Sequence, residues 1–384
     1  QTKAEFARHL MSIRGFATDK NRATVLEQQL QKEVNGIRDQ LQADVLLRLN
    51  GSKNLAVIRR RISDAFDNDP PMTEKGKVST SRQALIDSGD PSLMSLADIG
   101  KSEKLLSTYI PTLKSGSVHC RYSALMETGR TSSSKPNIQN LPRKGGIREC
   151  YIAREGFALF AIDYSTLELR ALAQVCLDLF GESEMAKAIN RGQDLHLALA
   201  AEILGVEYGE KARPARQFAK CGNFGYPGGM GSESLRDFSR GAGIEMTAIQ
   251  ADQLQDHWRR RWPEMEKYFR HINELIGYSG SATIEQHRSG RVRAGCSYTQ
   301  ACNTLFQGLA ADGAKLALFR ISADAYLNGG YYPLAFIHDE VIIEARDPKY
   351  AERVGDIMVA AMKEYTPDID IAVEINGPME RWSK

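Results

Sequence analysis

The feature that most constrains this chain is a pair of acidic residues inside an apolar run near the C-terminal end. Residues 333–345 read PLAFIHDEVIIEA, so Asp339 and Glu340 interrupt a segment rich in aromatic and β-branched residues. This composition favours two buried strands, where a carboxylate is costly. Two interpretations are open: a tight hairpin whose tip reaches water, or acids that are held in place to bind something positively charged.

A second apolar run also ends in an acid. Residues 156–165, GFALFAIDYS, predict a buried strand with Asp163 near its end. If the two strands are neighbours in one sheet, the carboxylates of Asp163 and Asp339 converge, and they repel each other unless a cation lies between them. Mg²⁺ is usually held by one or two carboxylates plus substrate phosphates, and a pair of such ions can promote an in-line phosphoryl displacement. Alternatively, each Asp is only a strand-end or turn acid.

Composition argues against several classes of protein. A chain of 384 residues is too long for one core, so we expect two or three subdomains. The net charge of +2 does not by itself indicate nucleic acid. The six cysteines include no CxxC pair, which argues against a structural zinc site or a disulfide framework and favours a reducing compartment. No apolar run approaches the roughly 20 residues of a membrane span, no signal peptide is visible, and a first residue other than Met indicates a fragment of a longer protein.

Hydrophobic periodicity predicts a mixed α+β chain with a long helical insertion between two strands. Apolar residues at three- and four-residue steps predict one long helix over residues 21–50 and a second helical region over 91–113. Residues 166–280 are predicted to be mostly helical, with glycine-rich interruptions. The remaining predicted elements are helices over 304–328 and 348–365 and a last strand over 370–376.

The run RQFAKCGNF, residues 216–224, places two cations and an aromatic ring on one stripe of a helix. Arg216, Lys220 and Phe224 are four residues apart in turn. The two cations repel mildly, by roughly a few tenths of a kcal/mol, and a triphosphate would remove that cost. Phe224 could then stack on a base or sugar, although a solvated basic face with a core Phe explains the same pattern. Pro227 and the adjacent glycines break the helix, so we expect a joint that can swing.

Basic and amide side chains also gather in TGRTSSSKPNIQNLPRKGG, residues 128–146. The cations could contact phosphates and the amides could bond sugars or base edges. A polar loop explains the segment nearly as well, because Ser, Asn, Pro and Gly form turns. Asn303 and Gln307 repeat the theme as amides four residues apart on a predicted helix. The cations of the segment are Arg130, Lys135, Arg143 and Lys144, and its amides are Asn137, Gln139 and Asn140.

Taken in this order, the segments resemble the family A DNA polymerases over nearly the whole chain. TGRTSSSKPNIQNLP is similar to the primer–template binding segment of that family, DYSTLELR to its first catalytic motif, RQFAKCGNFG to its nucleotide-binding helix and IHDE to its second catalytic motif. The resemblance implies an α+β multidomain fold, a right-hand polymerase with an antiparallel palm sheet, helical fingers and a helical thumb. The implied segments are an N-terminal palm-associated segment (1–17), thumb (18–112), first palm part (113–175), fingers (176–300) and second palm part (301–384).

The resemblance also implies an activity and its metal ions. The chain would be a template-directed DNA polymerase that adds dNTPs to a primer 3′-hydroxyl by two-metal-ion phosphoryl transfer and releases pyrophosphate. Asp163 and Asp339 would bind two Mg²⁺ ions, with Mn²⁺ as an alternative, and the backbone carbonyl of Tyr164 would be a further ligand. Glu340 would lie beside the metals as a supporting acid.

Substrate contacts follow from the same resemblance. Arg216 and Lys220 would hold the incoming triphosphate with the help of His196. Phe224 would stack on the nucleotide, and Glu168 would exclude a ribose 2′-hydroxyl. The residues implied to touch primer or template are Arg130, Asn137, Gln139, Asn303, Gln307 and His338.

The chain departs from the family pattern at two places. The family usually has a Tyr four residues after the helix Phe, where this chain has Gly228, so Tyr226 becomes the candidate aromatic contact to the nucleotide. Residues 293–303 are shorter than the pattern, which predicts a trimmed loop or helix. No acidic set before Arg130 fits a proofreading exonuclease, so we predict neither 3′→5′ exonuclease nor 5′-nuclease activity.

The expected partners are primer–template DNA and dNTPs, without a membrane. We expect a monomer, alone or within a larger polyprotein or replisome, in the cytoplasm of a bacterial or phage-infected cell or in an organelle, and not a secreted protein. Two alternatives remain. One is a single-subunit RNA polymerase, whose second motif reads His-Asp-Ser rather than the His-Asp-Glu found here. The other is a non-catalytic DNA-binding protein on the same fold.

Overall fold

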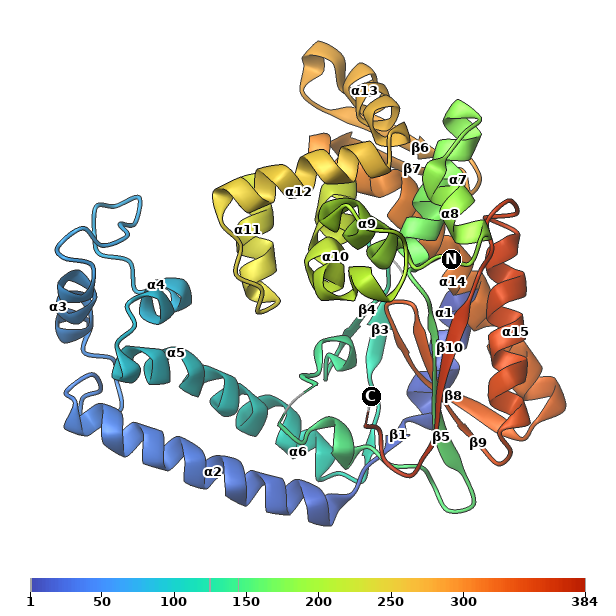
Figure 1. The fold of residues 1–384 in the computed structure, drawn as a ribbon. Helices are drawn as coiled ribbons and strands as arrows, with labels where there is room; N and C mark the ends of the chain where they lie inside the picture. The colour runs from blue at the N-terminus through green and yellow to red at the C-terminus, as the bar shows by residue number, and fades with distance from the viewer. Residues whose placement is uncertain (1, 124–125, 144, 384) are drawn as a thin grey trace. The chain divides into compact units, whose positions relative to one another are not determined.

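The two apolar runs that carry Asp163 and Asp339 lie side by side in one antiparallel sheet (Figure 1). β5 (Ala158–Tyr164) pairs with β9 (Glu340–Ala345) on one side and with β10 (Val373–Met379) on the other, and β8 (Tyr331–Ile337) is the edge strand beside β9. Every residue of β9 and most of β5 are buried, which explains why these runs do not alternate between apolar and polar residues. The prediction of buried strands is confirmed, and the condition that the two strands are neighbours in one sheet is met.

A computed structural model describes residues 2–123, 126–143 and 145–383. Contacts divide the chain into two units. The first unit comprises Gln1–Arg14, Cys120–Gln139 and Glu155–Met379, and the second comprises Gly15–His119, Asn140–Arg154 and Glu380–Lys384. None of the helices in the described ranges combines the length and apolarity that a membrane crossing needs.

In the first unit, one long helix organises the elements around the sheet. α14 (Tyr298–Asn328) packs against α15 (Lys349–Lys363), α7 (Leu167–Phe180) and α1 (Thr2–Arg14). α15 also contacts β5 and β10, so the sheet and this helix share a core. α14 begins six residues earlier than predicted, because Ser297 and Gln300 form a capping box at its start.

The insertion between β5 and β8 is mostly helical, as predicted. Its helices after α7 are α8 (Glu184–Asn190), α9 (Leu195–Leu204), α10 (Arg216–Gly225), α11 (Ser232–Gly241), α12 (Ala248–Arg261) and α13 (Glu264–Ile276), with short 3₁₀ turns at Glu210–Ala215, Tyr226–Gly228 and Gly277–Ser279. Periodicity did not predict the hairpin that follows, β6 (Ala282–Gln286) and β7 (Arg291–Cys296). A second small pair, β3 (Arg121–Ser123) and β4 (Ser132–Ser134), belongs to the same unit.

Asp178, near the end of α7, ties the turn of the β6–β7 hairpin to the helices. Its carboxylate accepts hydrogen bonds from Arg288 Nε at 2.6 Å and Nη2 at 2.5 Å, and it lies 2.5 Å from His287 Nε2. Burial by itself would raise the pKa of this carboxyl, but the hydrogen bonds from Arg288, His287 and Gln174 outweigh burial and lower the pKa. The ionised form is therefore the one that stabilises the fold.

Asp178→Asn should lower the free energy of unfolding by about 2 kcal/mol at neutral pH, the typical contribution of hydrogen bonds to a charged group. Because the folded-state pKa is depressed, this stabilisation is present above the ordinary Asp pKa and is lost as pH falls through the folded-state value. Urea titrations at a series of pH values would measure it, with Asp256→Asn on the exposed face of α12 as the matched control. A difference between variant and wild type that persists at acid pH would contradict this account.

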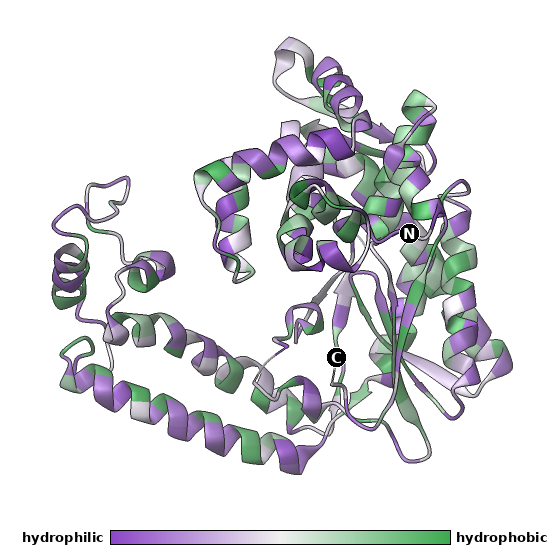
Figure 2. Cartoon of the chain, in the orientation of Figure 1, coloured by the Kyte–Doolittle hydropathy of each residue, from purple (hydrophilic) through white to green (hydrophobic). Residues whose placement is uncertain are grey.

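The second unit is built mainly on two long helical segments. α2 (Lys20–Ala43) packs against α5 (Pro91–Lys104), which continues through a π-helical turn (Leu105–Tyr109) into α6 (Ile110–Leu113). Figure 2 shows α2 with hydrophilic and hydrophobic residues alternating along its length, as expected for an amphipathic helix. The other elements are α3 (Leu55–Ala65), α4 (Arg82–Asp87), the strands β1 (Phe16–Ala17) and β2 (Ser117–Val118), and a 3₁₀ turn at Arg148–Cys150.

The helix predicted over residues 21–50 is shorter in the structure. α2 ends at Ala43, and Val45 adopts a left-handed backbone with φ of 60°. Leu46 and Leu47 then leave the path of the helix and are buried with Ile58 and Ile62 of α3. Their apolar character extends the helical pattern in the sequence, although they belong to a turn that packs under the next helix.

Candidate active site

A pocket of about 770 Å³ lies beside the two aspartates, entirely within the first unit. It is lined by β5, β10, the first turns of α7 and α9, α10, α14 and the turn between β8 and β9. The pocket brings together most of the residues predicted from the sequence. These are Arg130, Asp163, Tyr164, Glu168, His196, Arg216, Lys220, Phe224, Gln307, His338 and Asp339.

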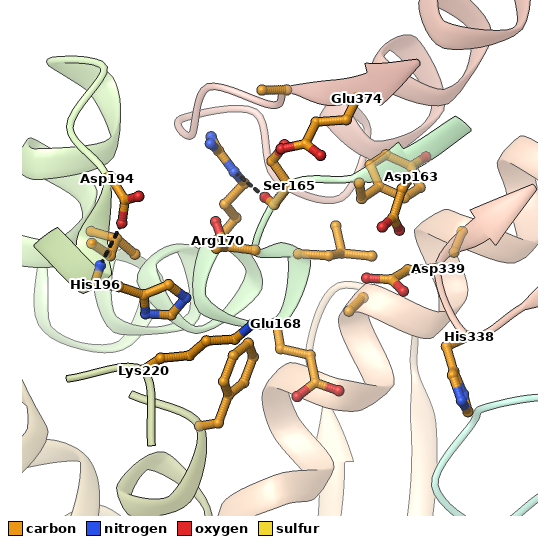
Figure 3. Close-up of a pocket in the computed structure, with 18 of the residues that line it drawn as sticks. Asp163, Ser165, Glu168, Arg170, Asp194, His196, Lys220, His338, Asp339 and Glu374 are labelled. Atoms are coloured by element: carbon orange, nitrogen blue, oxygen red, sulfur yellow. Dashed lines mark hydrogen bonds between the residues drawn. The ribbon is translucent and has the colours of Figure 1, made fainter. Parts of the chain in front are cut away.

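Asp163 and Asp339 approach each other because their strands are neighbours in register. Asp163 lies directly opposite Glu340 on β9 and Glu374 on β10. Asp339 is the second residue of the two-residue turn between β8 and β9, immediately before Glu340. Figure 3 shows the two carboxylates pointing toward one another. The structure shows the tight hairpin, with Asp339 in its turn, whereas binding of a cation by these acids remains a prediction.

The electrostatics of this pair favour a bound cation. Burial and, after it, the negative charge of Asp163 raise the pKa of Asp339 to about 7. A cation between the carboxylates would relieve both effects. Within the described ranges no group of three or more His, Cys, Asp or Glu side chains could hold a metal ion. Two carboxylates with backbone, water or substrate oxygens fit Mg²⁺, which commonly uses few protein ligands and completes its shell with phosphates.

A strained residue lies close to each aspartate. Thr166, at the start of α7, has φ of 51° and makes no side-chain capping bond, and a left-handed backbone is unfavourable for a β-branched residue. His338, directly before Asp339, has φ of 59° in the hairpin turn. The positive φ at the first turn position allows the two-residue connection. Backbone strain of this kind gathers at functional sites, where the surrounding fold maintains it.

Arg216 is held by a carboxylate that the sequence did not predict. Asp194 caps the N-terminus of α9, where its Oδ1 accepts from the backbone N–H groups of His196 and Leu197. Its Oδ2 accepts from Arg216 Nε at 2.8 Å and Nη2 at 2.6 Å. Burial alone would raise the pKa of Asp194, but these bonds outweigh it and keep the acid ionised. The positive charge of Arg216 is thus already balanced on the wall of the pocket.

Lys220 and Phe224 follow Arg216 on the same face of α10, as predicted. Lys220 Nζ lies 5.7 Å from the centroid of the Phe224 ring, and the His196 ring is 5.3 Å from it. Phe224 is 41% exposed. Among the described residues no carboxylate forms an ion pair with Lys220. This face therefore presents an aromatic ring and an unbalanced cation to the pocket.

Glu168 and Arg130 form an ion pair at the pocket wall. Glu168 belongs to the first turn of α7, and Arg130 comes from the loop before β4. This ion pair links Arg130, in the segment predicted to contact primer, to Glu168, which is predicted to exclude a ribose 2′-hydroxyl. Arg170, which also lines the pocket, donates from Nε to the backbone oxygen of Ser165 at 2.7 Å (Figure 3).

Asn137 and Gln139 lie outside the pocket and use their amides within the protein. Asn137 Oδ1 accepts from Ser133 Oγ at 3.0 Å and from the backbone N–H of Gln139 at 3.1 Å. Gln139 Nε2 donates to Thr131 Oγ1 at 2.8 Å and to the Phe336 carbonyl at 3.2 Å. These bonds attach the β4 segment to β8, the strand before the turn that holds Asp339. Contact with primer or template remains a prediction for both residues.

Gly228 stands where the family that the sequence resembles has a Tyr, and the local packing explains the small residue. A Cβ at this position would lie 2.7 Å from Asn303 Nδ2. Asn303 lies outside the pocket lining and donates to the Thr299 carbonyl at 2.8 Å, and its Oδ1 accepts from Gln307 Nε2 at 3.0 Å. Only Gln307 of the two amides reaches the pocket.

Tyr226 does not reach the pocket, which corrects its expected placement as a nucleotide contact. Its side chain is 1% exposed, and its hydroxyl donates to the Ala251 carbonyl at 2.8 Å. The ring packs on Trp258 with centroids 5.5 Å apart. The 3₁₀ turn after α10 rotates this residue into the helical core.

Two further predictions concern Glu340 and Lys144. Glu340 is buried at the start of β9 opposite Asp163, outside the lining residues. Lys144 lies outside the described residues.

The sequence interpretation missed Asp194, Arg170 and Glu374. An Asp before the apolar run LHLALAAEIL is a helix-start signal, but the other two carry no local signature.

Similar chains are known over almost the whole length of this one. The family model described as DNA polymerase family A matches residues 20–383. The DNA polymerase I of Aquifex aeolicus (strain VF5) is 29% identical over 389 residues, covering 97% of this chain and 65% of that protein. The thermostable DNA polymerase I of Thermus thermophilus is 32% identical over 330 residues, covering 81% of this chain and 39% of that protein. This chain therefore spans less than two thirds of the length of these relatives.

A solved structure has the same fold. It is described as the POL domain of Pol1 from M. smegmatis in complex with DNA primer-template and dNTP, and it matches with a TM-score of 0.80. The match covers 100% of this chain and 70% of that chain at 21% sequence identity. The predicted α+β polymerase fold with an antiparallel sheet is thereby confirmed.

Proposed function

The chain belongs to DNA polymerase family A, and from this membership we propose that it is a template-directed DNA polymerase that adds dNTPs to a primer 3′-hydroxyl and releases pyrophosphate. The observation that carries the proposal is that one pocket is lined both by two converging carboxylates and by the cations of α10. Phosphoryl transfer needs this combination, because catalysis consists mainly of positioning and of stabilising negative charge.

The carboxylates supply the metal site in this proposal. Asp163 and Asp339, with the backbone carbonyl of Tyr164, hold two Mg²⁺ ions, for which Mn²⁺ can substitute. When bound, such ions lower the pKa of the attacking hydroxyl and neutralise charge on the leaving group. The raised pKa of Asp339, caused by burial and by Asp163, supports this assignment because a carboxylate pair in that state gains from a cation. Glu340 acts as a supporting acid beside them.

The opposite side of the pocket binds the nucleotide. Lys220 and Arg216 contact the triphosphate, and His196 donates a further hydrogen bond. Phe224 offers an exposed ring face to the sugar and base. Glu168, held by Arg130, excludes the ribose 2′-hydroxyl. Closure of α10 on the correct nucleotide would couple nucleotide fit to assembly of the site. The proposed contacts to primer or template are Arg130, Asn137, Gln139, Asn303, Gln307 and His338.

Partners and surroundings follow from the activity. The substrates are primer–template DNA and dNTPs, and the protein works as a monomer, alone or within a larger assembly. We place it in the cytoplasm of a bacterial or phage-infected cell or in an organelle. The thumb is proposed over residues 18–112, the palm over 113–175 and 301–384 with the N-terminal segment 1–17, and the fingers over 176–300.

Primer extension tests the function. A labelled primer on a longer template should be extended with dNTPs and Mg²⁺, but not after chelation of the metal. NTPs in place of dNTPs should support little extension, because Glu168 occupies the site of the 2′-hydroxyl. Efficient NTP incorporation would favour the single-subunit RNA polymerase alternative, and binding without extension would favour the non-catalytic one. Without nucleotides the primer should stay intact, and its shortening would refute the predicted lack of exonuclease activity.

A further inference from the structure

Asn223, on α10 between Lys220 and Phe224, is buried in a set of hydrogen bonds that no predicted role accounts for. Its side chain is 1% exposed. Its Oδ1 accepts from Trp258 Nε1 at 3.1 Å and from Trp262 Nε1 at 3.0 Å. Its Nδ2 donates to the Leu195 carbonyl at 3.1 Å and lies 3.1 Å from His196 Nδ1. The polar contacts of this amide therefore come from two places, the first turn of α9 and the C-terminal end of α12.

The two indoles determine which way the amide points. An indole N–H can only donate, so the group that faces Trp258 and Trp262 must be the amide oxygen. A flipped amide would set its NH₂ group against two N–H donors and leave the Leu195 carbonyl facing an oxygen. The NH₂ group of Asn223 therefore faces His196, and His196 Nδ1 must accept the hydrogen bond.

His196 is neutral around physiological pH, so its tautomer matters. Burial, together with the positive charges of Arg216 and Lys220, lowers the pKa of His196 to about 4, although the negative charge of Asp194 opposes the shift. A neutral imidazole has one N–H donor and one acceptor nitrogen. With Nδ1 accepting from Asn223, the proton resides on Nε2, the nitrogen left to face the pocket that His196 lines.

We propose that Asn223 is a positioning residue, anchored by Trp258 and Trp262, which holds His196 in the Nε2–H tautomer so that this nitrogen donates to the triphosphate. The identity of the anion rests on the proposed function. The opposite tautomer would turn a lone pair toward the phosphate oxygens and repel them. Because Asn223 shares α10 with Lys220, the anchor also ties the orientation of His196 to the helix that binds the nucleotide.

The tautomer can be measured on the unaltered protein, without nucleotide and without activity. Labelling histidine with ¹⁵N gives ring-nitrogen shifts that distinguish a protonated from an unprotonated nitrogen, and His196→Gln identifies the signals. At about pH 7.5, above the ordinary histidine pKa, we expect a protonated Nε2 and an unprotonated Nδ1. A protonated Nδ1 overturns the proposal. This result is independent of polymerase activity, so failure of the proposed function would be recognised separately.

Asn223→Asp tests the consequence for nucleotide binding. The carboxylate can still accept from the indoles, but it now also requires a donor from His196 Nδ1. At about pH 8 we expect the KM for dNTP to rise about tenfold, the equivalent of one hydrogen bond to a charged group, with kcat little changed. As pH falls and His196 becomes an imidazolium, Nε2–H returns and the KM should approach that of the wild type.

The substitution His196→Gln supplies the control. In His196→Gln the terminal NH₂ group of glutamine lies near the position of Nε2, but glutamine does not take up a proton as pH falls. The double variant Asn223→Asp, His196→Gln should therefore show no recovery of KM at low pH. A purely structural role for Asn223 predicts a loss that does not depend on pH, and that outcome, or an unchanged KM, overturns the proposal. Thermal unfolding of each variant shows that it is folded, and if Asn223→Asp does not fold, the ¹⁵N measurement decides.

Discussion

Replacing Asp339 with asparagine should reduce primer extension at least about a thousandfold. Loss of this proposed metal ligand would remove several kcal/mol of transition-state stabilisation, and each 1.4 kcal/mol is about tenfold in rate. Asparagine fills the same space in the β8–β9 turn but carries no charge. The proposed contacts to DNA come from other residues, so the affinity for primer–template should change little. Single-turnover extension and a fluorescence-anisotropy titration of labelled DNA would measure the two quantities separately.

The control for this substitution is the same chemical change at Asp356, on the exposed face of α15. Asp356→Asn should leave extension within about twofold of wild type, as is usual for surface substitutions. Mg²⁺ gives a second readout without DNA. An ion that binds the folded protein raises its unfolding temperature, and this rise should be smaller in Asp339→Asn than in wild type. Retained extension, or an equal thermal shift in both proteins, would refute the assignment of Asp339 as a metal ligand.

The sheet and its two acids are predictable because their signals are local. β5 and β9 are interior strands, and burial on both faces leaves continuous apolar runs in which a carboxylate stands out. Antiparallel pairing of such runs brings the acidic residue of each run to the same end of the two strands. The stripe of Arg216, Lys220 and Phe224 follows equally directly from helical spacing. These features need no knowledge of how distant elements pack.

The choice of side-chain partners is not predictable in the same way. The carboxylate of Asp194 meets Arg216 because α9 packs against α10, and no spacing in the sequence encodes that contact. Tyr226 is two residues beyond Phe224, yet a 3₁₀ turn directs it into the core. Gly228 departs from the family pattern for a reason that only the packing of Asn303 reveals. A residue type can be carried over from a family, but its orientation depends on its neighbours.

Apolar residues in a turn also cause the end of a helix to be predicted wrongly from periodicity. Leu46 and Leu47 extend the pattern of α2 although the chain has already left the helix. Periodicity reports which residues are buried, not which element buries them. The boundary is set by the left-handed backbone at Val45, where a β-branched residue carries no obvious stop signal.

Lys220→Gln should lower kcat/KM for dNTP by about a hundredfold, in the range expected when one group that stabilises a transferring phosphoryl group is removed. Lys220 is chosen because its positive charge, unlike that of Arg216, is not neutralised by a neighbouring carboxylate in the part of the chain that the structure describes. Arg216 is already paired with Asp194, whereas the described residues provide no carboxylate partner for Lys220. In the proposed nucleotide site a triphosphate would therefore gain more from Lys220, and Arg216→Gln should have the smaller effect.

Lys211→Gln, an exposed position shortly before α10, is the matched control and should stay within about twofold of wild type. Lys220→Arg should retain much of the activity, because the charge is kept while the geometry of the donor changes. Pre-steady-state incorporation of a single dNTP would separate affinity from the rate of chemistry. If Lys220→Gln and Lys211→Gln behave alike, or if Arg216→Gln is the more severe, the charge argument is wrong, and the pocket then recognises the triphosphate through Arg216 after its release from Asp194.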